Sequence, residues 1–369
     1  MANMNIRTPR FYVDTISYLL SRGMTQNGEL DVTATGGSGT SATRGIQTGT
    51  EAELFDMNPL NKVDFDTSGD IDSQVLVTID TQSDASKKNF VAILNHNLKS
   101  ATGKIRIFAG NEPSDVTGVN AGNADTADVD WSNQSTTEVV NADAITVAAN
   151  DKNVVVEPGT DGSTIFTFNE TNLRHWGVQF EGYNGGTGNA VDGTWSGTDL
   201  FVGCILLGEY FDTPNSPDLS VTSSIMFDGV DVVETFGGKR FGNMRHSGRT
   251  HTATSKSPFT LAHPAYEGYG GRLAYDMSFS YLNATSVFPN RYQSLVHTDD
   301  TVISDVWNKT NGNHLPFIFS IDNAYTAADG SQANSESVHT FARFANNSLD
   351  LQQVAPDVWN VGFRVEEEF

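Results

Sequence analysis

Short hydrophobic runs separated by polar turns recur along most of the chain. Residues 90–98, Phe-Val-Ala-Ile-Leu-Asn-His-Asn-Leu, form the clearest of the early runs and end in polar residues. Residues 75–79 precede this run and residues 104–108 follow it; both are rich in β-branched or aromatic side chains and bounded by Gly, Asp and Ser. Such composition is typical of β-strands. The pattern therefore predicts three strands in the middle of a β-sandwich.

Four further runs predict the rest of a first domain. They lie at residues 154–156, 164–168, 176–180 and 201–208. The last run is apolar on both faces, which predicts a central strand. A sandwich of about eight strands is expected to close near Tyr210. Residues 213–218 contain two prolines, which stiffen a connector, and mark the predicted domain boundary.

A second β-rich domain is predicted after this boundary. Strand-like runs occur at residues 273–282, 315–321, 340–344 and 358–365. Residues 225–227 and 230–235, with the Gly237-Gly238 turn, predict a hairpin. Residues 299–307 predict one short helix, capped by aspartates and apolar on one face. The predicted organisation is an N-terminal arm with a Gly- and Thr-rich loop (1–50), a first β-sandwich domain (51–212) and a second β-rich domain (213–369).

Acidic residues outnumber basic ones, with 45 Asp and Glu against 22 Lys and Arg and a formal net charge of -23. Such a charge repels phosphate backbones and anionic membranes, so neither nucleic acid nor membrane is expected as a partner. No stretch approaches the roughly 18 to 20 apolar residues of a membrane span, and the N-terminus lacks the apolar core of a signal peptide. We therefore expect synthesis in a cytoplasm. The single cysteine, Cys204, lies in an apolar run and is expected to be buried.

Two segments are candidates for contacts between subunits. The main basic cluster contains Arg240, Arg245 and Arg249, and in so acidic a chain it predicts docking to an acidic surface of another subunit. A solvated loop that balances local charge is the alternative. The N-terminal segment, with the candidate contacts Arg7, Arg10, Phe11 and Tyr12, is either an arm that reaches a neighbour or a segment that packs on its own domain.

Asn95, His96 and Asn97 form a candidate ligand loop. They follow directly on a predicted strand, where amide and imidazole groups are able to contact sugar hydroxyls. The alternative is that they satisfy backbone groups in a turn.

A candidate calcium loop contains Asp64, Asp66, Ser68 and Asp70. Oxygen side chains at alternate positions with a Gly at the sixth are how a tight loop wraps around Ca²⁺. The twelfth position, however, is Val75 in place of a bidentate Glu. An acidic turn is therefore the alternative, and no other cofactor is expected.

Recognisable catalytic motifs are missing. The sequence contains no His-Glu-x-x-His, no Gly-x-Ser-x-Gly, no phosphate-binding lysine loop and no cysteine pair. A glycosidase needs only two carboxylates, which 45 acidic residues supply in many places, so a polysaccharide hydrolase is a third-ranked hypothesis. We expect a non-enzymatic protein.

Three stretches resemble virion structural proteins of tailed bacteriophages, of the minor tail, baseplate or head-associated type. They are residues 90–98, residues 207–214 leading to 234–238, and residues 315–319 continued through 341–344 to the acidic terminus. The resemblance implies a β-rich subunit of a symmetric assembly in the virion, with jelly-roll or galactose-binding-like sandwiches. Its partners would be copies of itself and other virion proteins. The leading hypothesis is a structural subunit associated with the tail or baseplate; the alternative is an adhesion module that binds a host surface glycan.

Overall fold

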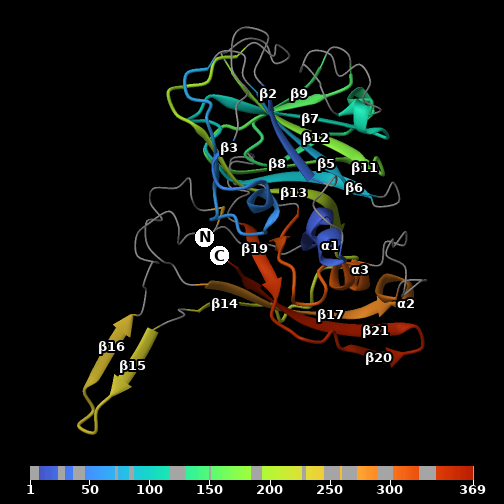
Figure 1. Cartoon of the computed structure of the whole chain (residues 1–369). Coiled ribbons are helices and arrows are strands. Elements are labelled where there is room, and N and C mark those ends of the chain that lie inside the picture. Colours follow the sequence, from blue (N-terminus) through green and yellow to red (C-terminus); the bar gives the residue numbers. More distant parts are fainter. Residues whose placement is uncertain are drawn as a thin grey trace.

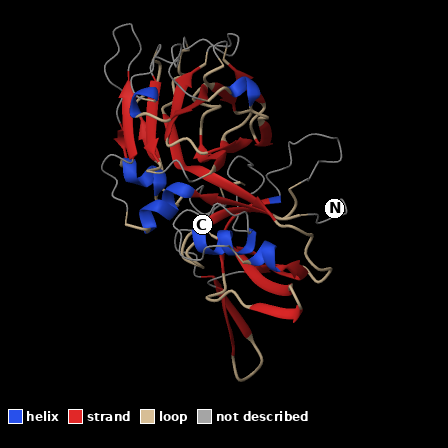
Figure 2. Ribbon diagram, turned by 90° about the vertical axis from the view of Figure 1, so that its right-hand side faces the viewer, coloured by secondary structure: helices blue, strands red, loops and turns tan. Residues whose placement is uncertain are grey.

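The computed structural model of the chain describes residues 8–23, 30–35, 46–70, 74–82, 87–116, 129–148, 151–183, 193–226, 230–244, 258–259, 272–288, 302–323 and 338–368. In this part the protein is mainly β, and its strands pair antiparallel in a 13-stranded, a six-stranded and a two-stranded sheet (Figures 1 and 2). No helix among these residues is long and apolar enough to cross a membrane.

The strands are β1 Arg10–Asp14, β2 Leu30–Thr35, β3 Ile46–Thr48, β4 Val63–Phe65, β5 Gln74–Asp80, β6 Lys88–His96, β7 Gly103–Gly110, β8 Thr137–Val140, β9 Ala144–Val147, β10 Val154–Glu157, β11 Gly162–Thr171, β12 His175–Gly182, β13 Leu200–Asp212, β14 Thr222–Met226, β15 Val230–Glu234, β16 Arg240–Met244, β17 Arg272–Asn283, β18 Phe317–Ser320, β19 His339–Phe344, β20 Leu351–Ala355 and β21 Val358–Glu367. The helices are α1 Thr15–Ser21, α2 Ala284–Val287 and α3 Val302–Lys309, with 3-10 turns η1 Glu51–Phe55, η2 Pro113–Asp115 and η3 Trp131–Asn133.

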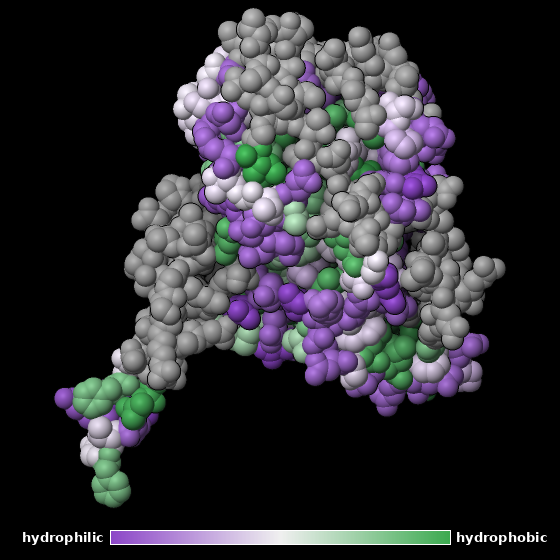
Figure 3. All heavy atoms as spheres, viewed as in Figure 1, coloured by the Kyte–Doolittle hydropathy of each residue, from purple (hydrophilic) through white to green (hydrophobic). Residues whose placement is uncertain are grey.

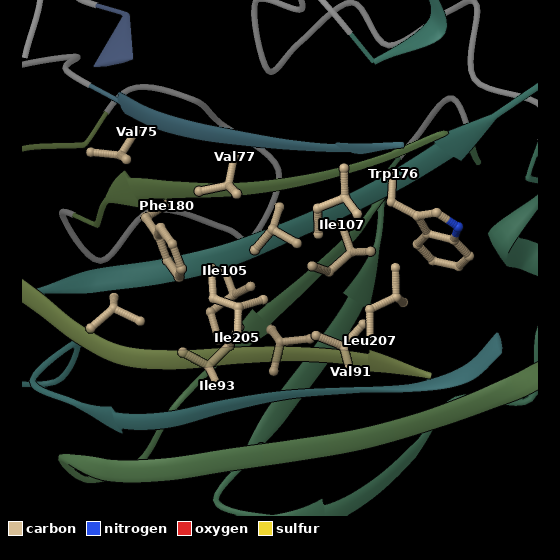
Figure 4. Packing of buried hydrophobic residues seen from close by; sticks show 14 of the residues in the cluster. Val75, Val77, Val91, Ile93, Ile105, Ile107, Trp176, Phe180, Ile205 and Leu207 are labelled. Atoms are coloured by element: carbon tan, nitrogen blue, oxygen red, sulfur yellow. The ribbon is translucent and has the colours of Figure 1, made fainter. Parts of the chain in front are cut away.

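In the first half of the chain, two sheets face each other across one core. The six-stranded sheet has the order β2-β5-β12-β7-β10-β9 and packs on the β13, β6 and β11 part of the large sheet. Alternate residues of each strand point inward, as a period of two requires. Figure 4 shows how the two sheets contribute to this core through Val75, Val77, Ile105, Ile107, Trp176 and Phe180 on one side and Val91, Ile93, Ile205 and Leu207 on the other.

The large sheet continues from the first half of the chain into the second half. Strand β1 lies between β13 and β18, with Phe11 registered against Phe211 on one side and Phe319 on the other. Strand β1, the first strand of the described part, therefore joins the two halves of the chain into one sheet. Residues 10–14, predicted to belong to an N-terminal arm, are a central strand, because both edges of β1 are paired.

A second core lies between β1, β18 and β19 and the strongly curved β17 and β21 part of the same sheet. The ring of Phe11 lies 5.5 Å from that of Phe317, 5.2 Å from that of Phe319 and 5.7 Å from that of Phe363. Aromatic contacts of this geometry add to the stabilisation from area burial. Helix α3 covers this core through Ile303 and Val306.

Most of the predicted strands are confirmed, and three details differ. Residues 75–79 and 104–108 belong to the six-stranded sheet, whereas residues 90–96 belong to the large one. The predicted helix at 299–307 is confirmed as α3 over Val302–Lys309, with residues 299–301 outside the described part, and the second half also contains α2. Strand β14, expected to pair within a hairpin, pairs with β17, whereas β15 pairs with β16 across Gly237 and Gly238.

Candidate functional site

The hairpin of β15 and β16, residues 230–244, is the main candidate site. Its two strands form a sheet of their own, registered from Val230 against Met244 to Glu234 against Arg240. The hairpin projects from the body of the molecule (Figures 1 and 2). An isolated two-stranded hairpin is only marginally stable in water, because neither of its faces is covered. The projecting hairpin therefore needs a source of stabilisation beyond its own two strands.

Large hydrophobic side chains are exposed on this hairpin. Val232 is 60% exposed, Val233 63% and Phe241 52%, and Phe236 at the tip is fully exposed. Val233 and Phe241 are registered opposite each other and so share one face, whereas Val232 lies on the other. Figure 3 shows hydrophobic side chains along the hairpin, away from the body. Several large apolar side chains exposed on one small element, here on both of its faces, are typical of an interaction site on a soluble protein.

The conformation of the hairpin turn leaves the Phe236 side chain exposed. Gly238 has φ of +78°, a left-handed conformation that glycine adopts without steric cost. The backbone N–H of Thr235 donates to the carbonyl of Lys239 over 2.8 Å, and that of Gly238 donates to the carbonyl of Thr235 over 2.8 Å. The tip is thus closed by its own hydrogen bonds, which leaves the Phe236 side chain in solvent.

Positive charge begins at this turn. Residues 235–256 hold five of the 22 Lys and Arg of the chain and none of its 45 Asp and Glu. Lys239 lies 5.0 Å from the centre of the Phe241 ring, and the guanidinium of Arg240 contacts the Glu234 carboxylate over 2.9 Å. The Arg240 side chain is 74% exposed next to the hairpin turn, and a contact residue has to be exposed in this way. The other two predicted basic contacts, Arg245 and Arg249, lie outside the described residues.

A cleft of about 350 Å³ lies where the two halves of the chain meet. Its lining comes from the end of α1, the turn after η1, the loop before β18 and strand β19. The apolar part of the lining is contributed by Leu20, Phe55, Met57, Leu315 and Pro316. Apolar side chains beside polar ones are typical of a protein interaction site.

The polar part of the cleft carries both signs of charge. The Asp56 carboxylate accepts hydrogen bonds from Asn58 N over 2.7 Å and Asn61 Nδ2 over 2.9 Å, and desolvation raises its pKa. Arg343 in the same lining donates to the carbonyl of His314 and lies 3.5 Å from the Glu368 carboxylate. Ser17, Ser21 and His314 complete the lining.

The predicted contact residues of the N-terminal segment lie inside the fold. Phe11 and Tyr12 are each 1% exposed. Arg10 binds Asp212 through two hydrogen bonds of 2.6 and 2.8 Å and stacks over the Tyr210 ring at 4.0 Å. These residues join β1 to β13, so the interpretation as a segment that packs on its own domain agrees with the structure. Arg7 lies outside the described residues.

The predicted ligand loop is also buried. Asn95 Nδ2 donates to the Pro59 carbonyl over 2.6 Å, and Asn97 bridges Asp199 O and Phe201 N. His96 Nε2 lies 2.9 Å from Thr164 Oγ1, while Nδ1 accepts from Leu98 N. Burial lowers the pKa of His96 to about 4. The three side chains satisfy backbone groups, which is the structural alternative, and they offer a sugar no exposed surface.

The predicted calcium loop does not gather its carboxylates. The backbone N–H groups of Thr67 and Ser68 both donate to Asp199 Oδ1, at 3.1 and 2.7 Å. Asp64 lies within β4, registered against Phe201. Among the described residues, no group of three or more His, Cys, Asp or Glu side chains is placed to hold a metal ion. In this part of the chain the acidic turn is the interpretation that fits Asp64, Asp66, Ser68 and Asp70.

A buried charged cluster on the outer face of the six-stranded sheet was missed by sequence reasoning. The Arg106 guanidinium contacts the Glu181 carboxylate at 2.7 Å, and Lys104 Nζ lies 3.3 Å from it. Gln179 Nε2 donates to both Gln74 and Glu181. The signal is present in the alternation of polar and apolar residues over 104–107 and 178–181. We expect a structural role for this cluster, because its members are at most 4% exposed.

Comparisons with known proteins found no matching family model, no matching curated protein and no matching solved structure.

Proposed function

We propose that this chain is a non-enzymatic structural subunit that assembles through its β15–β16 hairpin. The observation that carries the proposal is the exposure of Val232, Val233, Phe236 and Phe241 on a hairpin that pairs with no other strand of the described residues. Burying such side chains contributes roughly 25 cal/mol per Å² of apolar surface. A partner that covers the hairpin would supply the stabilisation that a lone hairpin lacks.

The setting we propose is the particle of a tailed bacteriophage, at the tail or baseplate, with synthesis in the host cytoplasm. The resemblance of residues 90–98, 207–214 and 315–319 to virion proteins supports it. Two facing sheets over one core further support a sandwich of the jelly-roll or galactose-binding-like kind for the first half. Folds of this kind serve as plain building blocks in many proteins. The partners would be copies of this chain and other virion proteins.

The test is the mass of the purified chain in solution, measured by light scattering over a range of concentrations. We expect an oligomer for the full chain. A variant in which a short Gly and Ser linker replaces residues 230–244 should be a monomer with an unchanged thermal transition, because the hairpin forms a separate sheet.

A matched pair of variants separates the hairpin from general surface hydrophobicity. Val233→Ser with Phe241→Ser should dissociate the oligomer, whereas Val354→Ser on β20, at a residue 46% exposed, should not. A full chain that stays monomeric at all concentrations contradicts the proposal, as does an oligomer that survives loss of the hairpin.

A further inference from the structure

We propose that the hairpin tip of one copy of this chain docks into the cleft between the two halves of the next copy. The inference rests on the proposed function, because it names the partner of the same hairpin. The occupant of the cleft is the Phe236 side chain, and its neighbours Glu234, Lys239 and Arg240 meet the polar rim.

Size and polarity support this match. Phe236 is fully exposed at the turn of the hairpin, and an aromatic side chain of this kind buries about 150 to 250 Å² when it is enclosed. The cleft has a volume of about 350 Å³, with Phe55, Met57 and Leu315 among its apolar lining. Buried aromatic anchors in pockets of this type supply most of the binding energy at protein interfaces.

Charge complementarity supports a copy of this chain as the occupant. The hairpin tip carries Lys239 and Arg240 beside the single acid Glu234. On the cleft side, Asp56 follows Glu51 and Glu53 of η1, and Arg343, which pairs with Glu368, also belongs to the lining. Lys239 and Arg240 of the tip would face the acidic residues Glu51, Glu53 and Asp56. Opposite charges of this kind orient a docked hairpin.

The hairpin and the cleft are different surfaces, so the contact is head-to-tail. Each chain offers one hairpin and accepts one. Contacts of this type build rings when the rotation between copies closes and filaments when it does not.

Cysteine cross-linking provides the direct test, because the native Cys204 is fully buried and burial raises the pKa of its thiol. Chains carrying Gly237→Cys, which keep Phe236 and place the thiol at an exposed position with open space around it, are mixed with chains carrying His314→Cys, at an exposed residue of the cleft lining, and oxidised. A covalent dimer is expected. Mixing Gly237→Cys with Gln353→Cys, on the exposed strand β20, is the matched control and should give none.

Affinity measurements give a second test. Phe236→Ala should weaken association by about tenfold or more, as loss of an anchor does. Filling the cleft by His314→Trp should have a similar effect, whereas Gln353→Trp should have none. Hairpin-dependent association without the specific cross-link would overturn the cleft assignment alone. A full chain that stays monomeric at all concentrations would overturn both the cleft assignment and the proposed function.

Discussion

Two buried titratable residues near the centre of the large sheet, His96 and Asp14, respond to pH in opposite directions. His96 is held neutral, because its Nδ1 accepts a hydrogen bond from Leu98 N. A proton added to Nδ1 would point at the N–H group of Leu98. Asp14 accepts from Ser17 N over 2.7 Å and Leu207 N over 3.0 Å at the start of α1, but burial still raises its pKa to about 6. Neither residue reaches a surface, and both act on stability.

His96 should make the protein sensitive to acid. The unfolded chain takes up a proton at a pKa near 6.5, whereas the folded protein does so near 4. The stability present above pH 6.5 is therefore lost as the pH falls from 6.5 towards 4. We expect a loss of about 2 kcal/mol between about pH 7.5 and about pH 5 from this residue. Urea unfolding of His96→Asn at the two pH values should lack that loss; an unchanged pH dependence would contradict the assignment.

Asp14 should act in the other direction. Its folded pKa of about 6 lies above the ordinary value of 3.8, so its contribution is present at low pH and is lost as the pH rises through 6. We expect the wild type to gain about 1 kcal/mol from Asp14 between about pH 7.5 and about pH 5. Asp14→Asn keeps a capping oxygen but does not titrate. Its unfolding free energy, compared with that of the wild type at both pH values, should lack this gain.

At the scale of elements, the strands that the sequence predicts best are those with long apolar runs. Strands β6 and β13 are buried on both faces, and their sequences are continuously apolar for that reason. Strands β2, β3 and β9 are short or lie in Gly- and Thr-rich sequence, so no pattern marked them. The role of β1 depends on partners some 200 and 310 residues away along the chain, which periodicity alone does not reveal.

The candidate site was only partly predictable for a related reason. The sequence singled out Arg240 and the Gly237-Gly238 turn, but Val232, Val233 and Phe241 look like any strand residues that pack on a core. Apolar side chains normally predict burial. Only the structure shows that these side chains are exposed and that, in the described part of the chain, their hairpin forms a sheet of its own. The cleft joins four segments distant in sequence, so nothing in one segment identifies it.

Strand β1 should hold the two halves of the molecule together. Phe11 contacts four phenylalanine rings, so Phe11→Ala removes a fully enclosed side chain and should cost about 3 to 5 kcal/mol. Val354→Ala on β20 is the control at an exposed site outside the proposed contacts and should change stability by less than about 0.5 kcal/mol. Urea unfolding of both variants measures the difference. Equal effects of the two substitutions would contradict the structural role of β1.

In the charged cluster between β7 and β12, removing a single charge should lower the unfolding free energy more than replacing the charges together by apolar residues. Glu181→Gln leaves Arg106 buried without its carboxylate and should cost about 3 kcal/mol or more. Replacing all three charges, by Lys104→Met and Arg106→Met with Glu181→Leu, should cost less than the single change, because neither buried cation is then left without Glu181. The comparison uses unfolding free energies from urea titrations. A triple variant that is less stable than Glu181→Gln would show that the cluster itself supplies net stabilisation.

At the scale of the whole molecule, the chain combines a continuous sheet with one projecting element. Because β1 ties the two halves into one sheet, the cleft between them has walls fixed by a shared core. A rigid receptor and a projecting hairpin on the same chain are the two parts that a head-to-tail assembly requires. The formal net charge of -23 would keep free copies apart, and the base-rich stretch 235–256, which begins at the hairpin turn, offsets that repulsion at one place.

Head-to-tail assembly predicts that two variants, each unable to assemble alone, bind each other through a single contact. A chain without residues 230–244 keeps its cleft, and a chain with His314→Trp keeps its hairpin. Each should be monomeric alone, because each lacks one half of the contact. Mixed in equal amounts they should form a heterodimer and stop there, because the remaining hairpin-less end and filled cleft have no partner. Light scattering of the mixture measures this directly. If the hairpins instead paired with each other, the His314→Trp chain would dimerise alone and the mixture would contain free hairpin-less monomer, which would exclude the head-to-tail contact.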